Sequence, residues 1–111
     1  MEARLFALQR LTALILVPLV LVHLALILYA IRGGLTAAEI LGRTQGSLAW
    51  ASFYGLFVLA AATHGAVGLR NILVEWARLA RPLANRVALT AALVLLLLGV
   101  RAVWAVIMGP T

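Results

Sequence analysis

Three long runs that are almost free of charge restrict what this sequence can fold into. Leu11–Ile31 and Ser47–Leu69 contain no Asp, Glu, Lys or Arg, and Val87–Met108 contains only Arg101. At about 1.5 Å per helical residue, each run can cross a hydrocarbon layer of about 30 Å. A bilayer offers backbone groups no hydrogen-bond partner, so such runs cross it as helices. The sequence therefore predicts an all-α integral membrane protein in one domain, residues 1–111, with three transmembrane helices at about 9–31, 47–74 and 86–108.

The composition excludes several other classes of protein. Hydrophobic residues make up 66% of the chain and charged residues 11%, whereas a soluble domain is nearer half apolar and a quarter charged. Cysteine is absent, which excludes disulfide scaffolds, thiolate zinc sites and iron–sulfur clusters bound by this chain. The net charge of +6 comes from arginines that flank the apolar runs. This pattern indicates a protein oriented in membrane lipid, with no nucleic acid as partner.

The arginines are divided unevenly between the two ends of the predicted helices. Cytoplasmic loops of membrane proteins carry an excess of Arg and Lys, so the richer end indicates the cytoplasmic side. We therefore expect a multi-pass protein whose N-terminus lies in the cytoplasm or on the equivalent matrix side, with a bacterial inner membrane as the expected location. The first apolar run is too long for a secretory signal peptide, so we expect a retained helix. The richer end holds Arg4, Arg10, Arg70, Arg78, Arg81 and Arg86, and the first loop holds Arg32 and Arg43.

Ionisable residues at membrane depth are costly, which makes His23 and His64 candidate functional residues. A membrane histidine can ligate a haem, relay a proton or form a hydrogen bond between helices. At about 100° per residue, Ala60, Ala61 and Gly68 share the side of the helix that carries His64. These small residues either leave room for a flat, bulky group or let a neighbouring helix pack closely. We expect a backbone carbonyl one turn earlier to fix one ring nitrogen of His64.

Two short motifs resemble those of a known family. The segment from His64 to Trp76 runs His-Gly-Ala-Val-Gly-Leu-Arg-Asn-Ile-Leu-Val-Glu-Trp. It resembles the second-helix motif of the succinate dehydrogenase and fumarate reductase membrane-anchor (cytochrome b) subunits. That motif has a histidine, a glycine four positions on, an arginine and an acidic–aromatic pair at the helix end. The segment Gln9-Arg10-Leu11-Thr12-Ala13 is similar to the entry sequence of the first helix in the same family.

The resemblance implies a membrane anchor of succinate:quinone oxidoreductase (respiratory complex II) or of its fumarate reductase relative. A flavoprotein and an iron–sulfur subunit would carry the dicarboxylate chemistry, so this chain would have no catalytic residue of its own. The anchor would bind haem b and help to form a quinone site, beside a second anchor subunit or a copy of itself. In the family, the histidine that matches His64 is an axial haem ligand, usually with a second histidine from the partner anchor.

The same resemblance assigns residues to a quinone region at the arginine-rich end. Arg10, Thr12 and Gln9 match family positions close to quinone, and Arg70 matches a residue that faces either quinone or a haem propionate. Trp76 stands where one anchor type has a quinone-binding tyrosine. Quinone reduction needs positive charge and hydrogen-bond donors, which these residues can supply. The alternative is that the arginines only orient the helices and that Trp76 only anchors at the interface.

His23 lies deeper in the membrane than these residues. It follows Arg10 by about 20 Å along the first helix, whereas His64 precedes Arg70 by about 9 Å on the second. Because the two helices run in opposite directions, the two histidines should lie at different depths. His23 is therefore a candidate ligand of a second, distal haem, or else a buried hydrogen-bonding residue.

Two alternative functions remain open at this stage. The chain could be an anchor that binds quinone without haem, in which the histidines serve packing or proton transfer. It could also be an unrelated small helical transport or scaffold subunit that contains two membrane histidines.

Overall fold

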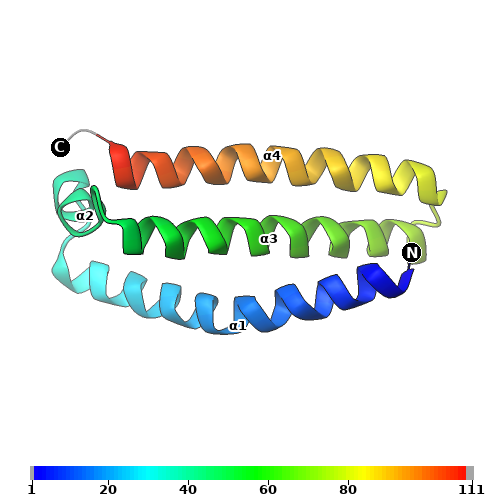
Figure 1. Ribbon diagram of the computed structural model, residues 1–111, viewed down its shortest axis with the longest axis horizontal. Helices are drawn as coiled ribbons and strands as arrows, with labels where there is room; N and C mark the ends of the chain where they lie inside the picture. Colours follow the sequence, from blue (N-terminus) through cyan, green and yellow to red (C-terminus); the bar gives the residue numbers. More distant parts are fainter. Residues whose placement is uncertain (1, 110–111) are drawn as a thin grey trace.

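A computed structural model describes residues 2–109 of the chain, and these residues form helices joined by short connections, without a strand. The predicted all-helical fold is confirmed (Figure 1). Residues 1, 110 and 111 of the predicted domain lie outside the described part. The helices are α1 (Glu2–Gly33), α2 (Ala37–Thr44), α3 (Leu48–Glu75) and α4 (Arg81–Met108).

Helices α1, α3 and α4 are long and apolar enough to cross a membrane, as judged by length and composition. This confirms the three predicted spans and a multi-pass integral membrane protein. Helices α1 and α4 begin earlier than predicted. The prediction rested on the uncharged runs, and the first turns of both helices carry arginines that lie outside those runs. Pro82 occupies the first turn of α4, where its missing N–H breaks no helical hydrogen bond.

Helix α3 lies between α1 and α4 and packs against both (Figure 1). Most of the buried residues where α3 meets its two neighbours are small. Small residues let helix backbones approach closely within a membrane. Most large apolar side chains of the described part are exposed, as expected for helices surrounded by lipid. The buried small residues are Ala60, Ala62 and Ala66 on α3 and Ala84 and Ala88 on α4.

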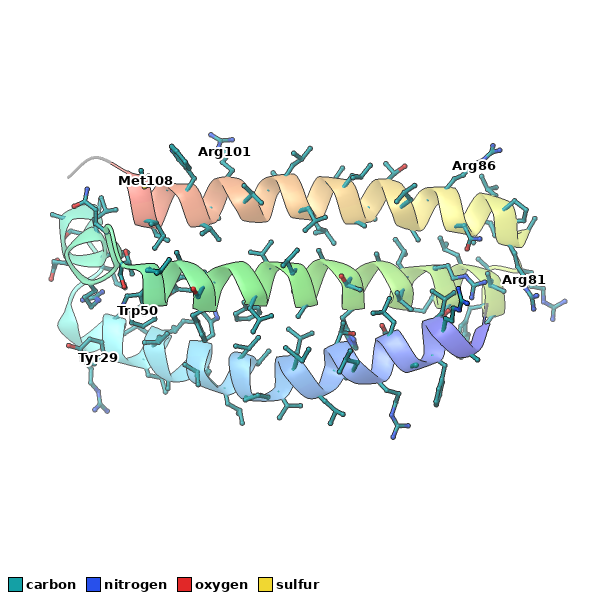
Figure 2. All side chains as sticks on the ribbon, in the orientation of Figure 1. Tyr29, Trp50, Arg81, Arg86, Arg101 and Met108 are labelled. Atoms are coloured by element: carbon teal, nitrogen blue, oxygen red, sulfur yellow. The ribbon has the colours of Figure 1, made fainter. Side chains whose placement is uncertain are left out.

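The N-terminus and the α3–α4 connection lie at the same end of the bundle (Figure 1). Figure 2 shows Arg81 and Arg86 at this end, and Arg101 near the opposite end, pointing away from α3. The arrangement therefore brings the predicted arginine-rich segments together. That this end is cytoplasmic stays a prediction.

Helix α2 lies between α1 and α3, and the residues that follow it form hydrogen bonds with the C-terminal end of α4. Its N-terminus has a capping box between Thr36 and Glu39. Past its C-terminus, Gln45 Nε2 donates to Gly109 O at 2.6 Å and Gly46 N donates to Ile107 O at 2.8 Å. These donors satisfy backbone oxygens that the end of a helix leaves without a partner. The uncharged runs predicted only the three long helices, so α2 is an addition to that prediction.

Gly99 allows a close approach between α3 and α4. A Cβ atom at this position would lie 2.9 Å from Val58 Cγ2 and 3.2 Å from Val58 Cβ. Val58 is β-branched and has little rotamer freedom in a helix, so it cannot move aside without shifting the backbone.

We predict that Gly99→Ala destabilises the protein by about 1–3 kcal/mol, the usual effect of overpacking. The measurement is the thermal unfolding midpoint in detergent. Gly55→Ala is the matched control, because a Cβ atom there meets nothing within 4 Å. The control should be neutral or more stable, since alanine favours the helix over glycine. Equal midpoints for the two variants would contradict this account of the α3–α4 contact.

Candidate functional site

The interface between α1 and α3 brings together several of the polar residues selected from the sequence. Because α1 and α3 run in opposite directions, the start of α1 meets the end of α3. His64 Nδ1 lies 3.2 Å from Thr12 Oγ1, at hydrogen-bond distance. Thr12 is buried, with 6% of its surface exposed. The partner of the His64 ring is therefore a hydroxyl on the facing helix and not the backbone carbonyl that we expected.

A small cavity lies at the same end of this interface, and we call it the polar cavity because four of its lining residues are polar, beside the apolar Leu5 and Phe6. It has a volume of about 260 Å³, with Arg10 and Gln9 on its α1 side and Asn71 and Glu75 on its α3 side. Gln9 Oε1 is buried and has no hydrogen-bond partner within residues 2–109. A Cβ atom at Gly68 would lie 3.2 Å from Gln9 Nε2, so glycine at this position gives the Gln9 side chain its space.

Arg70 is buried, with 4% of its surface exposed, and it joins α3 to α4. Its Nε donates to Asn85 Oδ1 at 3.0 Å, and its Nη1 donates to Asn71 Oδ1 at 3.2 Å. Asn71 also lines the polar cavity, so the hydrogen bond from Arg70 holds one of the side chains of the cavity wall. The side chain of Arg70 does not itself line that cavity.

Besides Arg70, two further residues assigned to the quinone region lie apart from the cavity. The Thr12 hydroxyl is directed to His64, and Thr12 is not among the cavity-lining residues. Trp76 caps the C-terminus of α3 and is 82% exposed. The structure thus brings together Gln9 and Arg10 with Asn71 and Glu75, and it pairs Thr12 with His64.

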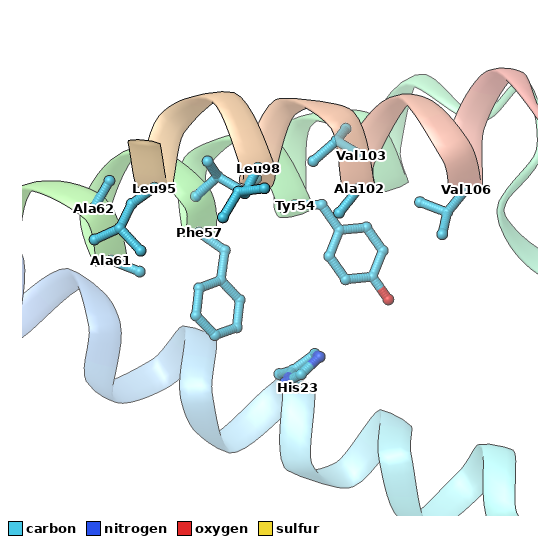
Figure 3. A pocket seen from close by; sticks show the side chains of 12 residues that line it. His23, Tyr54, Phe57, Ala61, Ala62, Leu95, Leu98, Ala102, Val103 and Val106 are labelled. Carbon is cyan, nitrogen blue, oxygen red and sulfur yellow. The ribbon is translucent and has the colours of Figure 1, made fainter. Parts of the chain in front are cut away.

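His23 lines a larger and mostly apolar groove between the three long helices. The groove has a volume of about 620 Å³. In Figure 3 the His23 ring lies below the rings of Tyr54 and Phe57, with Leu98, Ala102 and neighbouring α4 residues on the far side. The ring centroid of His23 is 5.1 Å from that of Phe57 and 6.3 Å from that of Tyr54, both in edge-to-face geometry.

The two histidines lie at different depths, as their positions in the sequence predicted. His23 packs against Tyr54 and Phe57, which precede His64 by roughly seven to ten residues, or about 10–15 Å along α3. Two axial ligands of one iron must both reach the same metal atom. His23 and His64 therefore cannot ligate the same haem from this one chain.

Sequence reasoning did not assign a role to several residues that contribute to these sites. Asn71 shares the helical face of His64, a spacing that was visible in the sequence. Tyr54 and Phe57, the aromatic rings of the His23 groove, follow Trp50 at the helical spacing i+4 and i+7, which could also have been noticed. Nothing in the sequence pairs Asn85 with Arg70, because that contact depends on how α3 and α4 align. The missed residues are Tyr54, Phe57, Asn71 and Asn85.

The fold and these sites define a class: a small three-span helical membrane protein with separate histidines at two depths and a polar cavity at its arginine-rich end. The family model of the succinate dehydrogenase/fumarate reductase transmembrane subunit matches residues 1–106, so the chain belongs to this family. No curated protein and no solved structure gives a significant match to the chain. Membership makes the chain a membrane subunit of a complex whose catalytic subunits are other chains.

We predict that Asn85→Ala destabilises the α3–α4 contact, because it removes the acceptor of Arg70 Nε. Hydrogen bonds to charged groups contribute about 1.5–3 kcal/mol, so the thermal midpoint in detergent should fall measurably. Asn85→Asp retains an oxygen acceptor and should preserve the wild-type midpoint. If Asn85→Ala melts like the wild type, Asn85 does not help to hold the buried arginine.

Proposed function

We propose that this chain is a haem b-binding anchor of succinate:quinone oxidoreductase that helps to form the quinone site. In this function, electrons pass from an iron–sulfur subunit to quinone at the membrane. The family supports the anchor role. The observation that carries the haem proposal is the His64 ring, held by Thr12 across the α1–α3 interface within the histidine motif.

The residues present fit a haem that His64 would hold. One nitrogen of the His64 ring is held by Thr12, and the other makes no hydrogen bond within residues 2–109. A neutral imidazole nitrogen is a common iron ligand. When bound there, haem b supplies one-electron redox chemistry, and His64 binds and orients it. His23 is too distant for the opposite position, so the second ligand would come from a second anchor subunit or a copy of this chain.

The polar cavity is suited to a quinone headgroup. Arg10 supplies positive charge where negative charge develops on a quinone oxygen, and the amides of Gln9 and Asn71 supply N–H donors. Glu75 is a carboxylate at the same cavity that can transfer a proton. At about 260 Å³ the cavity is below the usual range of ligand sites, so it would hold one ring while partner chains cover the rest.

An anchor that binds quinone without haem is the second candidate function. The observation that favours it is again the Thr12–His64 contact, because a hydrogen bond between helices can be purely structural in a membrane. The unrelated transport or scaffold subunit is set aside by the family match.

We predict that His64→Ala removes haem b while the chain still inserts in the membrane and assembles. The reason is that the variant lacks the imidazole that would bind the iron. Haem per complex is measured by the pyridine haemochrome method. Haem at the wild-type level in this variant would reject His64 as a ligand and leave the haem-free anchor.

We predict that Arg10→Leu slows succinate-to-quinone electron transfer by roughly 10²-fold, the usual effect of losing one group that stabilises developing negative charge. Succinate oxidation with a soluble artificial acceptor should be unchanged, because that reaction bypasses quinone. Arg4→Leu is the control, since Arg4 is exposed and does not line the cavity. If both activities fall in parallel, Arg10 serves assembly or orientation and has no role at quinone.

We also propose His23 as the ligand of a distal haem, supported by its depth and by the large apolar groove that it lines. The complex should then hold two haems, and His23→Ala should reduce the ratio to one. A ratio of one that His23→Ala leaves unchanged would make His23 a half-buried residue of the aromatic cluster and nothing more.

A further inference from the structure

The Thr12 hydroxyl has one hydrogen to donate and several acceptors around it. Its Oγ1 lies 2.9 Å from Leu8 O and 3.1 Å from Gln9 O, both on its own helix. It also lies 3.2 Å from His64 Nδ1. The backbone carbonyls can only accept a hydrogen bond, whereas an imidazole nitrogen can donate or accept. Thr12 is buried, so water does not compete for these positions.

Two arrangements of hydrogens are compatible with these distances. In the first, Thr12 donates to Leu8 O and accepts from a protonated Nδ1 of His64. In the second, Thr12 donates to an unprotonated Nδ1, and the proton of the ring sits on Nε2. The first arrangement makes two hydrogen bonds with the same three groups and the second makes one. A further hydrogen bond between partly buried groups stabilises the protein, which favours the first arrangement.

We propose that Thr12 is a positioning residue that fixes His64 in the tautomer with its proton on Nδ1. The other nitrogen, Nε2, then carries the free lone pair that an iron ligand requires. The tautomer follows from the contacts alone, and its use toward iron rests on the proposed haem function. The inference also gives Thr12 a role different from the quinone contact that the family resemblance implied, since its single donor is used on Leu8 O.

The hydrogen bond would also affect a bound iron. A ligand histidine that donates its second N–H becomes a more basic ligand. A more basic ligand stabilises the ferric form over the ferrous form, so the midpoint potential falls. Loss of the Thr12 hydroxyl should therefore raise the haem potential.

The first test needs no haem. The full chain, labelled with ¹⁵N-histidine and reconstituted in lipid without added haem, is examined by solid-state NMR, and His23→Gln assigns the two histidines. We expect Nδ1 of His64 to be protonated and Nε2 to be unprotonated. In Thr12→Val a large share of His64 should move its proton to Nε2, and Thr12→Ser should restore the wild-type pattern. A proton on Nε2 in the wild type, or no change in Thr12→Val, would overturn the inference.

The second test uses the assembled complex and its haem. The midpoint potential in Thr12→Val should rise, with a shift of the ferric/ferrous equilibrium of up to about tenfold, or about 59 mV for one electron. Thr12→Ser should match the wild type. If Thr12→Val loses haem and Thr12→Ser keeps it, the hydroxyl is required for positioning. An unchanged potential in Thr12→Val, or loss of haem in both variants, would reject the role of the hydroxyl. Neither result would decide whether His64 is a ligand, which His64→Ala tests separately.

Discussion

Inside a bilayer, a polar side chain must find its partner within the protein, and this requirement organises the molecule around α3. On one side of α3, His64 meets the hydroxyl of Thr12 on α1. On another side, Arg70 is buried and meets Asn85 on α4. Small residues along α3 bring both neighbouring helices close enough for these contacts. The helix in the middle therefore forms a polar contact with each neighbour, while α1 and α4 turn most of their large apolar side chains outward.

The beginning of α1 links the two parts of the proposed function. Gln9 and Arg10 line the polar cavity, and Thr12, less than one turn further on, holds the His64 ring. In the proposed function a quinone headgroup and a haem would thus share one short piece of helix, at the end where an iron–sulfur subunit would dock. His23 belongs to a different environment, an apolar groove about 10–15 Å deeper along the bundle.

The spans and the depths of the histidines could be predicted from the sequence because both follow from distance along one helix. The length of an uncharged run gives the thickness of membrane that a helix can cross. It does not give the full length of the helix, because first turns such as that of α4 carry charged residues and lie outside the run. Helical periodicity likewise puts Asn71 and Glu75 on the side of the helix that carries His64, although neither residue was assigned a role from the sequence. The partners of Thr12 and of Arg70 could not be predicted, because each contact depends on the relative shift of two helices, which no periodicity within one helix encodes.

The most direct test of the central claim, that this chain holds haem b through His64, is an experimental structure of the assembled complex. We predict a porphyrin whose iron is bonded to His64 Nε2, with Nδ1 of the same ring at hydrogen-bond distance from Thr12 Oγ1 and the opposite axial ligand supplied by another chain. A His64 ring that contacts only side chains or lipid, or an iron bonded to other residues, would contradict the claim.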